Sequence, residues 1–212
     1  MSSTVRATPG RPAVTSHEAI EKHAFALFEE QGFEATTVEE IVASAGIGRR
    51  TFFRYFPSKA DVAWGRFDDG LDAMRQHLWG LPTDLSMLDA IHSAILEFNR
   101  FPSEAMDQHR RRMRLILSTP ALQAHSAIRY ADWRHVISEF VAEREGLEVD
   151  DLLPRVVGHV SLAVALSAYE QWLAEGATAE LEPLLNEAVG GLRLYLMANG
   201  FATPGSAQLS AG

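Results

Sequence analysis

Apolar residues recur every three or four positions along almost the whole chain, which is the period of a helix with one buried face. Most of these stretches begin near Ser, Thr or Asp and end near Gly or Pro, the residues that start and stop helices. No stretch shows the competing two-residue period of a strand. We therefore expect an all-α fold of nine or ten helices between Thr15 and Gly200.

The most informative stretch runs from residue 37 to residue 59 and reads TVEEIVASAGIGRRTFFRYFPSK. Thr37 followed three positions later by Glu40 is the signature of a capping box, and Gly46 can adopt the left-handed turn that separates two short helices. Residues 48–56 then combine arginines with aromatic residues, so that one face of a helix packs and the other points outward. This pattern predicts a helix-turn-helix whose basic second helix lies in the DNA major groove.

These arginines could instead form an ordinary solvated helix face. Against this alternative, residues 44–59 contain four basic side chains and no carboxylate, although the rest of the chain is rich in acids. A local absence of acids beside a capping box and a turn glycine favours DNA reading.

Composition and charge limit the class of protein. The 212 residues are 47% hydrophobic and 22% charged, and none is cysteine, so disulfides and thiolate metal sites are excluded. We expect no secretory signal and no apolar run long enough to span a bilayer, and therefore a soluble, cytoplasmic protein. The formal charge is −9, of which residues 1–64 carry −1 and the remainder −8, so DNA is expected to approach one small basic surface only.

The expected organisation has four parts. Residues 1–14 form a flexible arm, residues 15–64 the helix-turn-helix domain, residues 65–200 a helical ligand-binding and dimerisation domain, and residues 201–212 a flexible tail. Arg11 in the arm is either inert or contacts the minor groove or a phosphate. The fourth helix is expected to run unbroken from Ser58 to Trp79, with the domain boundary inside it.

The last two helices predict a partner. Residues 156–168 are apolar or small on nearly all sides, and the pair Gly190-Gly191 costs helix stability unless another backbone packs closely. Burial within one chain could explain both features, but a dimeric four-helix interface explains them together and supplies two-fold symmetry. The expected interface comprises Val160, Ala163, Val164, Leu185, Val189, Gly190 and Leu192.

With these residues in view, TTVEEIVASAGIGRRTFFRYFPSKADV, preceded by EEQGF, resembles the N-terminal domain of TetR-type transcriptional regulators. The resemblance covers about Thr15 to Val62 and implies a homodimeric regulator, usually a repressor, that a small ligand releases from a palindromic operator. By position it places Thr37, Tyr55 and Lys59 on phosphates and Arg49, Arg50 and Thr51 on base edges. Arginine forks suit guanine and the threonine methyl suits thymine.

Two positions depart from the family pattern. Gly48 stands where Ser or Thr is common, which weakens the cap of the reading helix, and Phe53 stands where a tyrosine often donates to phosphate, a bond that Arg54 can replace. The segments GRPAVTSH, GIGRRTFFRYF, RYADWR and AYEQWLAEG are also similar to the branch of these regulators encoded with mycofactocin biosynthesis genes.

A ligand pocket is expected among the helices between residues 84 and 172. The arginines at 110–114 are either a solvated face or a site for an anionic ligand, and beside a long apolar pocket they would suit an acyl-coenzyme A. The candidate ligand residues are Phe98, Arg110, Met113, Arg114, Leu117, Trp133 and Trp172.

An enzyme is the main alternative class. The eight histidines are scattered without an H-x-x-x-H pair, and the chain has neither a Gly-rich phosphate loop nor a G-x-S-x-G motif. His92, His125, His135 and His159 lie on separate predicted helices and could meet, but a core histidine is commoner than a ligand. We expect no enzymatic activity, no cofactor and no metal; a helical ligand carrier with a vestigial DNA-binding head is a second alternative.

Overall fold

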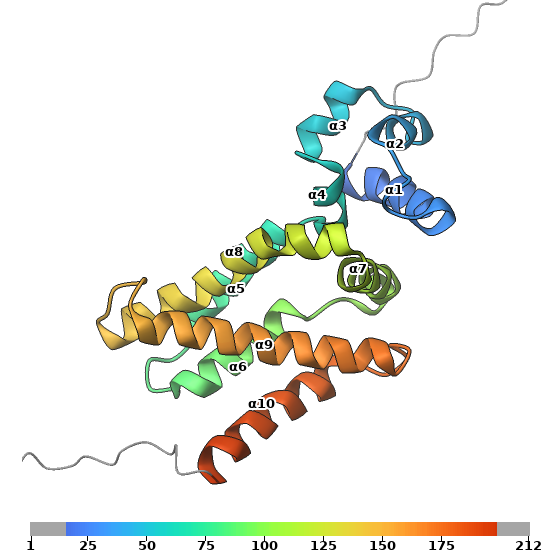
Figure 1. The fold of residues 1–212 in the computed structure, drawn as a ribbon. Coiled ribbons are helices and arrows are strands. Elements are labelled where there is room, and N and C mark those ends of the chain that lie inside the picture. The colour runs from blue at the N-terminus through green and yellow to red at the C-terminus, as the bar shows by residue number, and fades with distance from the viewer. Residues whose placement is uncertain (1–15, 199–212) are drawn as a thin grey trace, which may run out of the picture. The chain divides into compact units, whose positions relative to one another are not determined.

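The computed structural model describes residues 16–198, and within that range it contains ten α-helices and one short 3-10 helix (Figure 1). The all-α prediction is therefore confirmed for the described chain. The predicted arm with Arg11, the predicted tail, and Thr15 at the start of the predicted helix-turn-helix domain lie outside the described residues. The described chain forms two compact units, which we call the head, ending at Arg66, and the body, beginning at Phe67.

Four helices form the head: α1 (His17–Gln31), α2 (Val38–Ser44), α3 (Arg49–Tyr55) and α4 (Lys59–Trp64). α1 packs against α2 and α4, while α2 and α3 contact each other across a tight turn. Burial of a large apolar side chain contributes about 1.5–3 kcal/mol, and every helix of the head supplies at least one. The large apolar residues buried in the head are Ile20, Phe25, Phe28, Phe33, Ile41, Val42, Phe52, Phe56, Val62 and Trp64.

The prediction of one long fourth helix is wrong. The chain ends α4 at Trp64, turns at Gly65 and resumes as α5 (Phe67–Gly80). Gly65 has φ 57° and ψ −129°, a conformation that side chains disfavour, and its N–H donates to the Asp61 carbonyl at 3.2 Å. The apolar period continues across the break, so periodicity alone does not reveal it.

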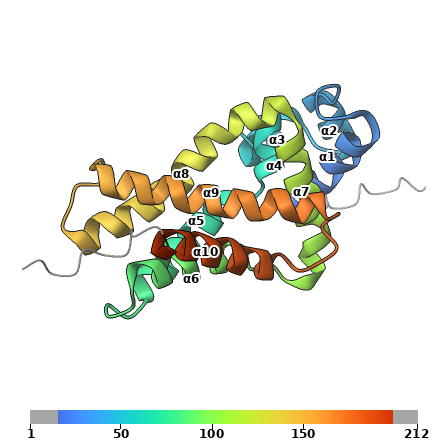
Figure 2. The same cartoon turned by 60° about the horizontal axis from the view of Figure 1, so that its bottom comes forward.

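The body contains α5, α6 (Met87–Phe98), the 3-10 helix η1 (Ser103–Ala105), α7 (Met106–Ser118), α8 (Pro120–Glu145), α9 (Leu152–Ala174) and α10 (Leu181–Ala198). α9 lies alongside both α8 and α10, as Figures 1 and 2 show from two directions. α5 packs against α6 and α8, and α7 packs against α8.

From the sequence, the helices now labelled α1, α6, α7 and α10 are expected to begin at Thr15, Asp84, Ser103 and Thr178, and each begins elsewhere in the structure. Ser16 rather than Thr15 precedes α1, and its hydroxyl accepts a hydrogen bond from the Ala19 N–H at 3.2 Å. Ser86 rather than Asp84 caps α6 in the same way. The predicted start of α7 is occupied by η1, and α10 begins later than predicted. These serines offer a short side-chain oxygen at the position where the first free N–H groups need one.

α9 passes close to α8 at Gly158. A Cβ atom on Gly158 would lie 2.8 Å from the Ser138 Oγ and 2.9 Å from the Arg134 carbonyl oxygen. The Ser138 hydroxyl also donates to the Pro154 carbonyl at 3.0 Å. The absence of a side chain at Gly158 therefore allows the two longest helices of the described chain to approach each other.

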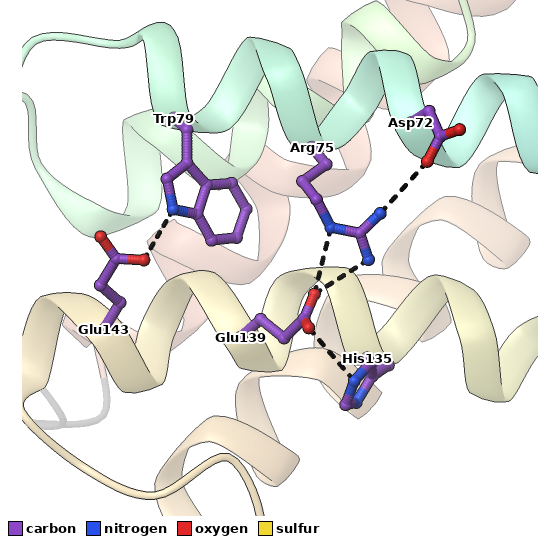
Figure 3. Close-up of polar contacts among 6 residues, drawn as sticks. All are labelled: Asp72, Arg75, Trp79, His135, Glu139 and Glu143. Carbon is purple, nitrogen blue, oxygen red and sulfur yellow. Dashed lines mark hydrogen bonds and ion pairs between the residues drawn. The ribbon is translucent and has the colours of Figure 1, made fainter.

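Polar side chains join α5 to α8 in the seam of Figure 3. The Arg75 guanidinium contacts one oxygen of Glu139 through Nη2 at 2.9 Å and Nε at 3.3 Å, and His135 approaches the other oxygen at 3.3 Å. One helical turn further along α8, Glu143 accepts a hydrogen bond from the Trp79 indole at 2.6 Å. Because partly exposed ion pairs contribute only about 0–1 kcal/mol, the seam sets the alignment of the helices more than their stability.

α9 is long and apolar enough to cross a membrane by length and composition, so the prediction that no segment meets that test is wrong. In the fold it is a core helix, because it packs along α8 and α10 and buries Trp172 completely. Burial on all sides was expected for residues 156–168, but within one chain Val156 and Val160 are exposed.

The predicted interface residues divide into three groups. Val160 and Ala163 are exposed, whereas Val164, Gly190 and Leu192 are half-buried. Leu185 and Val189 are buried within the chain, where they pack against the body and do not contribute to an exposed face.

We expect Gly158→Ala to destabilise the body by about 1–3 kcal/mol, because the added methyl would overlap a backbone carbonyl that cannot move independently. Alanine favours helices over glycine, so propensity alone predicts the opposite sign. Urea unfolding followed by circular dichroism measures the change. Gly80→Ala is the control, since nothing lies within 4 Å of its added Cβ; equal stability of the two variants would contradict the close crossing.

Candidate DNA-binding site

The first helix of the helix-turn-helix is held by the predicted capping box. The Thr37 hydroxyl accepts from the Glu40 N–H at 3.2 Å, and the Glu40 carboxylate accepts from the Thr37 N–H at 2.8 Å. The same carboxylate oxygen also accepts from the Thr37 hydroxyl at 2.8 Å and from Gln31 at 3.1 Å. These donors keep the pKa of Glu40 below its ordinary value of 4.5, with the Thr37 backbone N–H as the largest cause.

The turn and two buried rings set the direction of α3. Gly46 has φ 65°, as the sequence predicted, and the Ile47 N–H donates to the Val42 carbonyl at 3.0 Å. Phe52 and Phe56 are buried with their ring centroids 5.8 Å apart. Because these positions are four residues apart, the opposite face of α3 points to solvent.

The exposed face of α3 carries three arginines. Arg49, Arg50 and Arg54 are all exposed. Arg49 forms an ion pair with Glu39 of α2 and lies 5.6 Å above the ring of Phe53, whereas Arg50 has no hydrogen bond or ion pair to any described residue. The structure therefore places the predicted arginines together on one surface. No described side chain competes with DNA for the guanidinium of Arg50.

Other predicted contacts are less available. Thr51 and Tyr55 are half-buried, and the Tyr55 ring packs edge-on against His17 at 4.8 Å. Gly48 precedes α3 without a side-chain cap, as expected from its lack of a hydroxyl. Lys59, predicted to contact a phosphate, directs its ammonium to the carbonyl oxygens of Phe33 and Thr36, each at 2.6 Å.

The sequence interpretation missed one residue of this surface. Phe53 stands where the family often has a phosphate-contacting tyrosine and was not itself predicted to contact DNA, but it is 44% exposed and lies on the same face as Arg49. Its spacing could have revealed this position. Phe53 follows Arg49 by four residues, so the two share a helix face, and it is adjacent to the buried Phe52, which lies on another face. An exposed ring here provides an apolar contact beside the arginines.

Four of the predicted ligand residues of the body form two aromatic contacts. The rings of Phe98 and Trp133 meet edge-on at 6.1 Å, and Arg110 lies 5.9 Å above Trp172 while pairing with Asp107. Met113, Trp133 and Trp172 are buried, Phe98, Arg110 and Leu117 are half-buried, and Arg114 is exposed.

The body also contains a buried polar chain that the sequence did not reveal. His109 Nε2 lies 2.7 Å from the Tyr169 hydroxyl, which donates to Asn99 Oδ1 at 2.6 Å. Phe101 stacks on His109 at 3.9 Å. Burial lowers the pKa of His109 to about 3 and raises that of Tyr169, so both side chains are neutral at physiological pH.

No group of three or more His, Asp or Glu side chains between residues 16 and 198 is placed to hold a metal ion. His135, one of the four histidines considered as ligands, lies in the α5–α8 seam beside Glu139.

A capped helix, a glycine turn and a basic exposed helix, followed by a separate helical body, define a helix-turn-helix transcriptional regulator. Residues 20–63 match the family described as bacterial regulatory proteins, tetR family, and residues 85–196 match the one described as MftR C-terminal domain. The chain therefore belongs to the TetR family of bacterial transcriptional regulators, which is not a family of enzymes.

One relative extends the similarity to both units. A Mycobacterium tuberculosis protein named as a mycofactocin biosynthesis transcriptional regulator, MftR, is 42% identical over 175 residues, which are 82% of this chain and 88% of the relative. The predicted resemblance to the mycofactocin-associated branch is thereby confirmed.

Solved structures show the same fold. FadR from Bacillus subtilis, a transcriptional regulator in complex with stearoyl-CoA, has a TM-score of 0.57 and 14% identity over 82% of this chain and 96% of that one. FadR from Thermus thermophilus, a TetR family repressor in complex with lauroyl-CoA, has a TM-score of 0.53 and 20% identity over 92% and 100%.

The capping box should make the stability of the head depend on pH. Because the folded-state pKa of Glu40 is depressed, its contribution is present above pH 4.5 and is lost as the pH falls through the folded-state value. Glu40→Gln should therefore lower the melting temperature at pH 7, and its difference from the wild type should shrink below about pH 4.5. Glu30→Gln, an exposed carboxylate of α1, is the control; a difference for Glu40→Gln that does not vary with pH would contradict this prediction.

Proposed function

We propose that the protein is a repressor that binds a palindromic operator as a homodimer and is released by a small, acyl-CoA-like effector. The single observation that carries the DNA-binding part is the exposed face of α3, where Arg49, Arg50 and Arg54 stand together. Each head offers one such face, and a dimer would place two in successive major grooves. Such a protein acts in the cytoplasm, and its similarity to MftR points to mycofactocin biosynthesis genes as its targets.

The exposed faces of α9 and α10 support the dimer. Val160 is 40% exposed and Leu194 is 69% exposed, although both are large and apolar. On α10, Cβ atoms added to Gly190 or Gly191 would meet nothing within 4 Å, so packing within the chain does not account for the glycine pair. A second copy that covers these helices would bury the valine and leucine and approach the glycines closely.

The operator contacts can be tested after selection of bound fragments from genomic DNA and footprinting of the retained site. A two-fold palindrome is expected. On that site, Arg50→Ala should cost about 1–3 kcal/mol, and on random duplex much less, because a guanidinium that reads a base edge discriminates between sequences.

Arg100→Ala is the matched control, because Arg100 is an exposed arginine of the body, paired with Glu97. Equal losses for Arg50→Ala on both DNAs would make Arg50 a phosphate contact. Weak retention without sequence preference, even by the wild type, would instead favour the ligand-carrier alternative.

The effector proposal rests on α7 and on the solved relatives. Arg110 and Arg114 lie on either side of the buried Met113 in sequence, so cationic and buried apolar side chains occur together on one helix. The two FadR structures hold long-chain acyl-CoA molecules. Arginine binds phosphate through paired N–H groups, and the CoA moiety carries phosphates, so a cationic site beside an apolar interior suits both ends of the ligand.

Long-chain acyl-CoA should therefore release the operator and raise the melting temperature. At a ligand concentration one hundred times the dissociation constant, the expected stabilisation is about 2.7 kcal/mol. Fluorescence anisotropy of labelled operator and thermal unfolding measure the two effects. Free CoA and the free fatty acid are the ligand controls, and Arg114→Gln should weaken the response to acyl-CoA while Arg100→Gln should not. If acyl-CoA neither shifts the melting temperature nor releases DNA, this effector class is wrong.

A further inference from the structure

We propose that Lys59 positions the reading helix by holding the loop between α1 and α2, and that it does not neutralise a DNA phosphate. This inference rests on the proposed DNA-binding function, because the position of the loop affects function through operator recognition. It assigns Lys59 a role different from the phosphate contact that the family resemblance implies.

The Lys59 ammonium sits among three backbone carbonyl oxygens. Its Nζ donates to Phe33 and Thr36, each at 2.6 Å, and lies 3.4 Å from the Glu34 oxygen. A lysine ammonium has three N–H groups, so each can be given one carbonyl. The Nζ also lies 4.3 Å from the centroid of the Phe33 ring, within the range of a cation–π interaction. The head therefore satisfies this charge internally.

Lys59 donates hydrogen bonds to the loop between α1 and α2, and α2 begins at the end of this loop. Thr36 directly precedes the capping residue Thr37, and its hydroxyl donates to the Gly32 carbonyl at 2.8 Å. Gln31 donates both to the Thr36 hydroxyl at 3.3 Å and to Glu40 at 3.1 Å. Lys59 thus joins the first residue of α4 to the corner that caps α2, and α2 in turn packs against α3.

Moving the ammonium to a phosphate would be costly. Three loop carbonyls would lose their donor, and loss of a partner from a partly buried group costs more than one additional exposed charge contact gains. Lys59 is half-buried, which restricts the movement of its side chain. Burial lowers the pKa of Lys59, and the charges of Glu34 and Glu40 oppose that shift. Arg50 and Arg54 are more accessible charges for phosphates.

The composition of the chain provides a clean comparison. Among its 212 residues there are only two lysines, Lys22 and Lys59. Lys22 is exposed on α1 of the same head. Lys22→Met and Lys59→Met therefore remove the same charge from the same unit, and only Lys59→Met removes the loop contacts.

The experiment measures the affinity of both variants and the wild type for the selected operator and for random duplex DNA. Each affinity is measured at several salt concentrations, at a temperature below the melting temperature of every variant. For Lys59→Met we expect operator affinity to fall by about tenfold or more and the preference for operator over random DNA to shrink, because the reading helix is misplaced. The slope of log affinity against log salt on random DNA should stay at the wild-type value. Lys22→Met should leave both the preference and the slope unchanged.

Two results would overturn the proposal. A slope reduced by about 0.9 for each lysine lost, with the operator preference intact, would show a phosphate contact. An unchanged operator affinity and preference, with only a lower melting temperature, would show that Lys59 stabilises the head without positioning the reading helix.

A measurement without DNA separates this inference from the proposed function. Hydrogen exchange of the Thr37 and Glu40 amides should be faster in Lys59→Met than in Lys22→Met, because the loop that carries the cap is released. Equal exchange rates in the two variants would show that Lys59 does not hold the loop, whatever the DNA-binding results are. The wild type could show no preference for the operator while the amides still exchange faster in Lys59→Met. In that case the DNA-binding proposal fails, and Lys59 holds the loop without a role in DNA recognition.

Discussion

The head depends on one constraint, which is that three of its four helices are too short to be stable alone. α2 and α3 have seven residues each and α4 has six, whereas isolated helices below about 12–15 residues are marginal in water. Their order must come from caps and from shared burial. Thr37 and Ser58 cap α2 and α4, Gly48 gives α3 no side-chain cap, and Phe52 and Phe56 anchor α3 by packing instead. The least capped of the three helices is therefore the one proposed to read DNA, and its position follows from its neighbours.

In the body, the constraint is how the long helices cross. α8 and α9 have 26 and 23 residues, so their stability as helices needs little help from caps, and what must be specified is how they cross. Gly158 and Ser138 provide small residues at the crossing, and the polar seam between α5 and α8 adds directional contacts on another side of α8. The same α9 that is buried against α8 keeps Val160 exposed, which divides the helix between the interior of one chain and the proposed contact with a second.

Much of this fold could be predicted from residues that act locally. The capping box of Thr37, the positive φ of Gly46 and the serine cap of α4 are all decided by a few neighbouring residues, and all three were correctly predicted. The missed features depend on tertiary contacts. The break at Gly65 is hidden because the apolar period continues across it, and the acceptors of Lys59 are backbone carbonyls, which no side-chain pattern records.

The same limit applies to burial. Phe53 and Val189 are both apolar residues on helices with a plausible buried face, yet the first is exposed and the second is inside the body. Periodicity tells which residues share a face and leaves open which face turns inward, since that depends on the other helices. The proposed DNA surface was therefore predicted through its charged residues, whereas the exposed Phe53 ring beside Arg49 and the division of the interface residues required the structure.

The buried polar chain of the body has a fixed direction. Asn99 Nδ2 lies 2.7 Å from the Ile95 carbonyl, which can only accept, so the amide must present its oxygen to Tyr169. Tyr169 has one proton and gives it to that oxygen, so His109 must hold its own proton on Nε2, and its Nδ1 is left as an acceptor. A backbone carbonyl on α6 thus selects the tautomer of a histidine on α7 through a tyrosine on α9, and a change at any one of the three side chains would reorder the protons of the others.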